Sequence, residues 1–511
     1  MRLAVSLSVV LALAGPLAAE APMSAIDWLS DTVARPPPEP EPPSDPDIAG
    51  RPLEDIATTV IEAAARDAVG VLSTAATGLP RGFWAASETD RLVELMSGDG
   101  AEHLPATRDL LLMLLLAELD PPLDADGSGR FLLARIDRLL ELGALDAANA
   151  LIEVAGPTTP DLFRRAFDTA LLLGQEDAAC AELRRNPRIA PTLPARVFCL
   201  ARGGDWQAAS LTLNTAQALG QVDPADEALL ERFLDPALHE DAPPLPPPDR
   251  PSPLTLRIFE AIGDAIPATG LPLAFAHADL SPATGWKARI EAGERLARAG
   301  AIEPARLFAL YTERLPAASG GVWDRAAAVL RVESGRARGD PGAVAAALPR
   351  VWQALAAADL EVPLAEMHAE RLLRLPVRGE AGRIAFRLGL LSPAYEAAAL
   401  ARVPEDAEET FLAGLARGRI AGLVPPDSMA RAIAPAFVEG GPETVIGAQV
   451  AGLIDQGRTG EAVLVALGRI GEGAVGDRRG ITEGLAVLRR LGLEGVARRT
   501  ALQLMLLERR G

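Results

Sequence analysis

The residues of this chain that come closest to a metal-binding pattern lie between Asp124 and Phe131. This segment, DADGSGRF, places oxygen-bearing side chains at the first, third and fifth positions of an EF-hand calcium loop, with glycine at the sixth. The twelfth position of such a loop requires a glutamate that binds the ion through both oxygens, and here it is Arg135. We therefore interpret the segment as a turn in which Ser128 caps a helix that begins near Arg130.

The other chemical signatures are weaker. The segment GEGAVG, residues 471–476, has the spacing of a dinucleotide-binding loop, but a predicted helix precedes it where such loops need a strand. The four histidines are not at metal-ligand spacing, and acidic pairs such as Glu366/Glu370 are common on solvated helices. The sequence therefore predicts no catalytic residue, no metal site and no cofactor.

Tryptophans are the remaining candidates for a functional role. Four of them fall in or beside predicted helices: Trp206, Trp286, Trp323 and Trp352. Aromatic side chains on the concave face of a helical array often anchor protein partners, but they also fill gaps between helices. With only 4% aromatic residues in the chain, both roles stay open, and the four are candidate partner-binding residues.

The two cysteines have a spacing that suits a disulfide. Cys180 and Cys199 are equidistant from the middle of NPRIAPTLP, a loop predicted between two helices. Residues equidistant from such a turn face each other on antiparallel helices, so an oxidising compartment would join them. The alternative is a pair of buried thiols that pack as small apolar side chains.

The elements that carry these residues follow a repeated pattern. Seven times a glycine is followed five residues later by an alanine, between two apolar helical segments. Glycine allows a helix to stop, and a small alanine allows the next helix to cross closely. The pattern predicts helical hairpins stacked in sequence, at the pairs Gly143/Ala148, Gly174/Ala179, Gly204/Ala209, Gly300/Ala305, Gly389/Ala394, Gly457/Ala462 and Gly492/Ala497.

One of these hairpins resembles a known repeat. The run from Gly204 through Asp205 and Trp206 to Ala209 resembles the second half of a tetratricopeptide repeat, in which a Gly-Asp-aromatic turn joins two helices. The resemblance covers about half of each repeat, and the first-helix signature residues are mostly absent. It implies membership of the helical-repeat superfamily, and an all-α fold in the form of an α-solenoid that grips peptides or protein surfaces.

The N-terminus has the features of an export signal. Arg2 precedes a short apolar core that is too short to span a bilayer, and cleavage is expected after Ala19. The alternative is an uncleaved anchor. Residues 20–53 are rich in proline and charge, so we predict a solvated, disordered tether.

A second proline-rich break divides the rest of the chain. Residues 241–253 are predicted to link an N-terminal helical-repeat block, 54–240, to a C-terminal block, 254–511. The sequence leaves open whether the blocks are separate lobes or one curved array. The opening segment GLPRGFWAASETDRLVELM, residues 78–96, is not a standard repeat, and we expect it to cap the exposed apolar end of the stack.

Composition bounds the compartment and the partners. A formal net charge of −19 disfavours nucleic acid and anionic lipid, and no transmembrane segment is expected after signal cleavage. A single lysine, Lys287, among many arginines and alanines is typical of a high-GC bacterium. The predicted location is therefore the periplasm.

These features lead to three hypotheses about function. The first is a non-catalytic scaffold that docks onto a protein of a bacterial envelope machine, such as the flagellar motor, cell-wall synthesis or outer-membrane assembly. The second is a chaperone-like protein that binds peptides of unfolded exported clients. The third, which the sequence supports least, is a cell-wall-modifying enzyme. The oligomeric state is not readable from the sequence.

Overall fold

The computed structural model describes residue 28 and residues 66–97, 104–190, 192–438, 440–476 and 478–507. The predicted signal peptide and, apart from Trp28, the predicted tether lie outside these residues. Over the described part of the chain the secondary structure is helical, with one isolated bridge between Leu72 and Ala117 and no strand. The prediction of an all-α protein is therefore confirmed.

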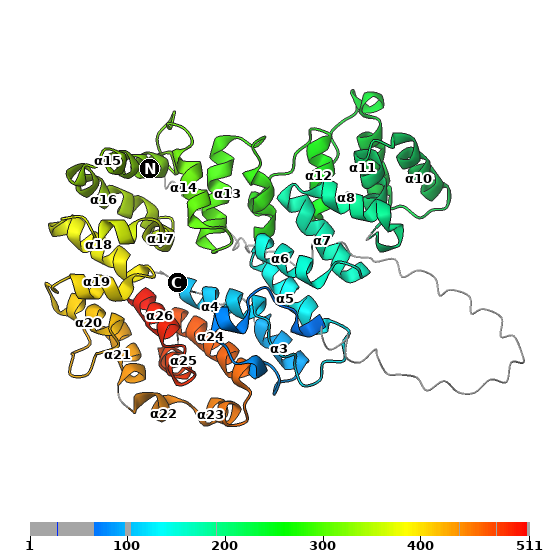
Figure 1. The fold of residues 1–511 in the computed structure, drawn as a ribbon. Helices are drawn as coiled ribbons and strands as arrows, with labels where there is room; N and C mark the ends of the chain where they lie inside the picture. The colour runs from blue at the N-terminus through cyan, green and yellow to red at the C-terminus, as the bar shows by residue number, and fades with distance from the viewer. Residues whose placement is uncertain are drawn as a thin grey trace, which may run out of the picture.

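The helices follow one another in neighbouring pairs (Figure 1). The first group is α2 (Thr74–Thr77), η2 (Arg81–Phe83), α3 (Thr89–Met96), α4 (Pro105–Leu116), α5 (Arg130–Glu141) and α6 (Leu145–Ala155). The second is α7 (Pro160–Leu173), α8 (Glu176–Arg185), η3 (Pro187–Ile189), α9 (Leu193–Arg202), α10 (Trp206–Ala218), α11 (Pro224–Leu234), η4 (Pro236–His239) and α12 (Pro253–Ala261).

The longer third group completes the chain. It comprises η5 (Ala268–Gly270), η6 (Leu273–Leu280), α13 (Trp286–Arg298), α14 (Pro304–Thr312), α15 (Val322–Ala337), α16 (Pro341–Ala356), α17 (Glu361–Leu372), α18 (Gly379–Leu391), α19 (Tyr395–Ala401), α20 (Ala407–Ala416), α21 (Ser428–Ile433), η7 (Ala434–Phe437), α22 (Gly441–Val445), α23 (Ala448–Asp455), α24 (Thr459–Val475), α25 (Arg478–Arg490) and α26 (Glu494–Leu506).

Six of the seven predicted turn glycines do end a helix in the left-handed conformation. At Gly174, for example, φ is 72°, and the amides of Gly174 and Gln175 donate to the carbonyls of Leu171 and Ala170. This arrangement satisfies carbonyls that the end of α7 would otherwise leave free. The other five are Gly143, Gly204, Gly300, Gly457 and Gly492.

The prediction for the seventh pair, Gly389/Ala394, is wrong. Gly389 lies inside α18, and the turn falls at Ser392, whose amide and hydroxyl both donate to the Gly389 carbonyl. A Cβ on Gly389 would lie 2.5 Å from the Cβ of Ala398, so the glycine is required by the close approach of α19 rather than by a turn. The expected crossing alanine, Ala394, is only half-buried, and Ala398 takes its place. Ala305 is likewise exposed instead of lying at a helix crossing.

The two ends of the described array meet. Helices α24 and α26, at the red end of the chain, pack against α3 and α4, at the blue end (Figure 1). The amide of Ala106 donates to Oε1 of Gln503 at 2.9 Å, and Arg91 reaches Glu461 at 3.4 Å. Sequential hairpin packing is thus confirmed, but an open-ended solenoid is not. The described helices form a closed array.

The segment predicted to cap one end of the stack joins both ends. The rings of Phe83 and Trp84 are buried, and Trp84 lies against Gly460 at the start of α24, where a Cβ would be 2.3 Å from the ring. The large aromatic side chain therefore occupies space that only a glycine on α24 leaves open. The cap seals a junction between the N- and C-terminal helices.

Buried apolar side chains form two large clusters. The main one is built mostly from α3–α6 and from the helices after η5, and the second from α7–α12, which we call the outer lobe. Helix α12 follows the predicted linker, yet it packs with α7 and α11 in the outer lobe. The division into domains at 241–253 stays a prediction. Trp28 is buried in the main cluster, edge-on to Phe275 with ring centroids 5.4 Å apart, unlike the solvated tether predicted around it.

Candidate partner-binding surface

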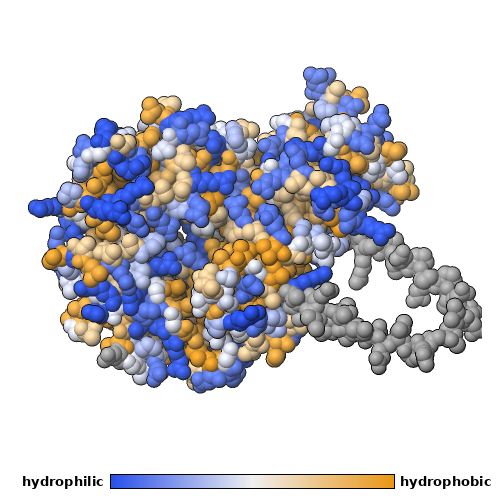
Figure 2. All heavy atoms as spheres, viewed as in Figure 1, coloured by the Kyte–Doolittle hydropathy of each residue, from blue (hydrophilic) through white to orange (hydrophobic). Residues whose placement is uncertain are grey.

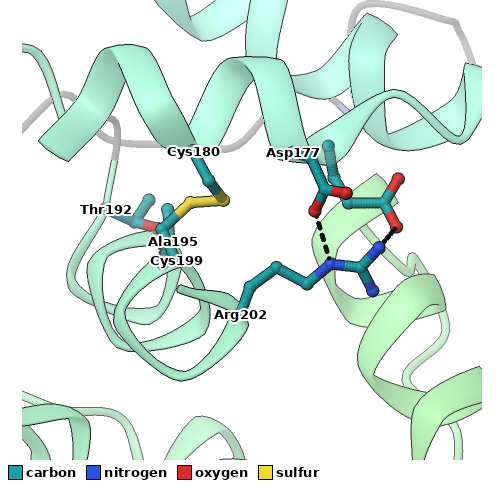
Figure 3. The surroundings of a disulfide bond; sticks show 7 residues. Asp177, Cys180, Thr192, Ala195, Cys199 and Arg202 are labelled. Carbon is teal, nitrogen blue, oxygen red and sulfur yellow. Dashed lines mark hydrogen bonds and ion pairs between the residues drawn. A yellow bond between two sulfur atoms is a disulfide. The ribbon is translucent and has the colours of Figure 1, made fainter. Parts of the chain in front are cut away.

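The outer lobe is braced by the predicted disulfide, which is confirmed. Cys180 on α8 and Cys199 on α9 are bonded, with their Cα atoms 5.0 Å apart. Beside the disulfide, Arg202 at the end of α9 reaches back to Asp177 on α8, with Nε 2.8 Å from the carboxylate (Figure 3). A covalent bond and an ion pair therefore hold α8 against α9.

Trp206 is the first residue of α10, the helix that follows the disulfide-linked pair α8 and α9. The residue is 48% exposed, and its ring centroid lies 5.9 Å from that of Phe233 on α11. Phe233 in turn stacks on Phe198, whose neighbour along α9 is the disulfide cysteine Cys199, with centroids 5.7 Å apart. Trp206 is thus the outermost ring of an aromatic row that leads inward to the disulfide. A ring held in this way loses little freedom on binding.

Helix α10 exposes two further apolar side chains, Leu211 on a different side of the helix from Trp206 and Leu219 just after its last residue. No charged residue occurs between Trp206 and Val222, although 23% of the chain is charged. Leu211 is 68% exposed and Leu219 is 64% exposed. Hydrophobic residues are visible at the outer edge of this lobe, on the right of the view in Figure 2. Exposed apolar residues grouped without charges are typical of contact surfaces between proteins.

A groove opens on the same lobe beneath the proline-rich segment. It has a volume of about 710 Å³ and lies between α7, α11, α12 and the chain from Leu245 to Arg250, which we call the strap. Phe167, Leu229 and Phe259 are among its apolar lining residues. The segment that the sequence predicts as a linker therefore forms one wall of a groove. Asp226 lines it as well, and burial raises the pKa of this carboxyl, helped by the neighbouring Asp223.

The other candidate tryptophans do not join Trp206. Trp286 and Trp323 pack against each other with centroids 5.0 Å apart, partly buried on the main cluster. The indole N–H of Trp286 donates to the carbonyl of Leu310 at 2.8 Å. Trp352 is partly buried on α16. The structure brings two of the four together and places Trp206 elsewhere, against Phe233 at the edge of the outer lobe's apolar cluster. Partner binding by any of the four stays a prediction.

The calcium-like loop is held by hydrogen bonds within the protein. Asp124 accepts from the amide and hydroxyl of Thr89, and Asp126 accepts from the amide of Ser128. Helix α5 does begin at Arg130, but its cap residue is Gly129, so the capping role predicted for Ser128 is wrong. The carboxylate of Asp67, distant in sequence, accepts from the amide of Leu132 instead.

Arg135, at the twelfth position of that loop, is one of the largest fully buried side chains of the described residues. Its guanidinium donates to the carbonyls of Leu115, Ala117, Val69 and Asp67, and only 1% of the residue is exposed. Burial lowers the pKa of Arg135 to about 10, so it stays protonated at neutral pH. Its hydrogen bonds tie residues 67–69 to the end of α4.

Comparisons with known proteins give no family. The sequence matches no protein-family model, and no curated protein or solved structure matches it significantly. Within the described residues, no helix is both long and apolar enough to cross a membrane, and no three histidine, cysteine or acidic side chains are grouped so as to hold a metal ion. The many packed helices are consistent with a helical-repeat protein. That the chain is not an enzyme stays a prediction.

Sequence reasoning named Trp206 but missed the residues around it. Leu211 and Leu219 belong to a helix whose core-facing residues are unremarkable, so hydrophobic periodicity alone did not single it out. The missed signal was the absence of charge over residues 206–222 in an otherwise charged chain. The strap was missed because a proline-rich stretch is as typical of a free linker as of a segment that packs along a groove.

Proposed function

We propose that this protein is a non-catalytic interaction scaffold outside the cytoplasm, and that its outer lobe binds a protein partner. The observation that carries the proposal is the uncharged segment 206–222 of the disulfide-braced lobe, in which Trp206, Leu211 and Leu219 are all exposed. Burying these side chains removes apolar surface from water, and it does not require the removal of charges from water.

The architecture supports a scaffold more than a catalyst. The main array closes on itself, so it offers a rigid base, while the outer lobe exposes apolar side chains in a segment without charge. A disulfide is stable where thiols are oxidised, which supports a location in the periplasm. The partner would be a protein of an envelope machine, with the flagellar motor, cell-wall synthesis and outer-membrane assembly as candidates.

Site-specific photo-crosslinking in living cells tests this proposal. A photoreactive residue at position 211 should give one discrete crosslinked envelope protein. A matched control at Leu400, which is 72% exposed on α19 in the main body, should give none. The double variant Leu211→Glu/Leu219→Glu should remove the crosslink formed from a probe at position 206. Equal crosslinking from positions 211 and 400 would count against the outer lobe as the binding surface.

A chaperone-like peptide binder is the second candidate, and the groove beneath the strap favours it. Its volume and apolar lining suit side chains of an extended peptide, and the Asp226 carboxylate suits a basic residue beside them. This candidate predicts many crosslinked products from a probe at position 245 and binding of varied unfolded peptides. A single product would favour the scaffold.

A further inference from the structure

A second pocket lies at the junction of the outer lobe and the main body, and it differs in character from the groove beneath the strap. Its volume is about 460 Å³. The ends of α7, α8, α9 and α12 form one side, and η6 with α14 forms the other. Its charged side chains are three arginines and two glutamates: Arg202, Arg257, Arg306, Glu176 and Glu260.

A buried histidine in this pocket has one ring nitrogen that accepts no hydrogen bond from the described residues. His277 is 4% exposed, and its Nε2 lies 2.8 Å from the carbonyl oxygen of Gly143. A carbonyl only accepts, so Nε2 must carry the proton, and burial lowers the pKa of His277 and keeps the ring neutral. The other nitrogen, Nδ1, is then a buried acceptor with no partner among the described residues. Native proteins rarely leave such an acceptor unsatisfied.

A carboxylate oxygen of Glu176 in the same pocket is also buried and receives no hydrogen bond from the described residues. Oε1 of Glu176 pairs with Arg202 at 2.9 Å, whereas its Oε2 is buried and has no hydrogen-bond partner among the described residues. Two unsatisfied acceptors, one of them on a carboxylate, are the groups that would receive the N–H bonds of an ammonium.

The arginines provide donors for the opposite charge. Arg306 on α14 is about half exposed, and its guanidinium comes no closer than 3.9 Å to Asp146. Arg257 uses Nε for the carbonyl of Leu171 and Nη1 for Glu260, and its Nη2 lies over Gly174 in the pocket wall. Guanidinium groups with free N–H edges bind carboxylates in a directional way.

We propose that this junction pocket binds a small zwitterion, an amino acid or short peptide, with its carboxylate on Arg306 and Arg257 and its ammonium on Glu176 and His277. With three cationic and two anionic side chains, the lining is close to neutral, which suits a zwitterion better than a phosphate or another strong anion. The volume is in the range of small-molecule sites. The site is separate from the partner-binding surface, and the two proposals stand or fall independently.

Titration calorimetry on the full mature chain tests the ligand class. The probes are leucine, the dipeptide Ala-Ala, and two analogues of leucine that each lack one charge, isoamylamine and isocaproate. Leucine or Ala-Ala should bind, and both analogues should bind at least about tenfold more weakly, since each leaves one set of pocket groups unpaired. If leucine binds more tightly than Ala-Ala, the ligand class is a free amino acid, and the reverse order indicates a short peptide. Absence of binding by both, or equal binding by a single-charge analogue, would overturn the proposal.

Variants locate the site and separate binding from folding. Arg306→Gln and Glu176→Gln should each weaken zwitterion binding at least about tenfold, with the first also removing the preference for a carboxylate. Arg314→Gln is the matched control, because this residue lies two positions after the end of α14, is outside the pocket and is 62% exposed at its side chain. Because a His277 variant also loses the bond to Gly143, the partly exposed Arg306 is the decisive position. Binding that is unchanged in both pocket variants would overturn the assignment.

Discussion

The main body and the outer lobe are stabilised in different ways, although the same kind of hairpin builds both. In the main body the chain ends meet, and buried charges have several partners: Glu294 accepts from Tyr311 and from two nitrogens of Arg325. The outer lobe has a smaller apolar cluster, and it has the disulfide. A small core supplies less stabilisation, and a covalent constraint offsets this.

The comparison teaches where each region can expose apolar surface. The main body also exposes apolar side chains, such as Leu315, Leu400 and Val424, but these lie in segments that contain charged residues. The outer lobe joins the main body mainly through α7, whose residues contribute to both clusters: Leu162 and Leu172 to the main one, Phe163 and Phe167 to the other. Among the described helices, α10 on the far side of the lobe packs mainly against α9 and α11, and Leu211 on it stays exposed. The variants below separate the two regions, from the largest expected effect to the smallest.

Removing the buried guanidinium of the main body should have the largest effect. Arg135→Met would leave four carbonyls without their donor, and we expect a loss of about 3–5 kcal/mol in the free energy of unfolding, measured with urea. Arg130→Met is the control: this residue is on the same helix, its side chain is 61% exposed, and the expected loss is below about 0.5 kcal/mol. Similar losses in both variants would refute the special role of Arg135.

Loss of the disulfide should destabilise the outer lobe alone. For a sequence separation of 19 residues, Cys180→Ala/Cys199→Ala should cost about 3 kcal/mol. Hydrogen exchange resolves the location: amides of α8–α10 should exchange faster, and those of α24–α26 should keep their wild-type rates. A uniform acceleration would mean that the two regions unfold as one unit.

The corrected role of Gly389 gives a sharper test within the main body. Gly389→Ala would place a methyl group 2.5 Å from Ala398, and we expect a loss of about 1–3 kcal/mol. Adding Ala398→Gly should restore part of this loss, because it removes the opposing methyl. Gly174→Ala, where the cost of about 1 kcal/mol comes from a positive φ, should gain nothing from Ala398→Gly. Thermal unfolding of the four variants checks the pattern.

Acidification should affect the histidine of the junction. Burial lowers the pKa of His277 below its ordinary value, with Asp146 and Arg306 as its charged neighbours. The unfolded chain therefore binds more protons below about pH 6.5, and the contribution of this ring to stability is present above that pH and lost as the pH falls toward the folded-state pKa. The slope is at most about 1.4 kcal/mol per pH unit. His277→Gln should flatten the wild-type stability curve between pH 7 and 5, and parallel curves would exclude the effect.

Local chemistry explains how much of this fold the sequence predicts. Glycine at Gly174 or Gly457 ends a helix through its own backbone freedom, so hairpin positions are readable without knowledge of distant residues. The disulfide was readable for a similar reason, since Cys180 and Cys199 lie symmetrically about one short loop. Trp206 is a candidate from the sequence because its turn resembles a known repeat, and its role in binding stays a prediction.

What only the tertiary structure decided involves residues far apart in the chain. The contact of Trp84 with Gly460 and the bond between Ala106 and Gln503 close the array, and no local pattern marks these residues as partners. Gly389 shows the limit most clearly, because its sequence context matches the turn glycines while its actual constraint is a methyl group on the next helix. The sequence by itself thus determined the hairpins and their order, since hydrogen bonds and helix ends act over a few residues. Closure, the junction pocket and the exposed face of α10 depended on how side chains from distant hairpins fill shared space.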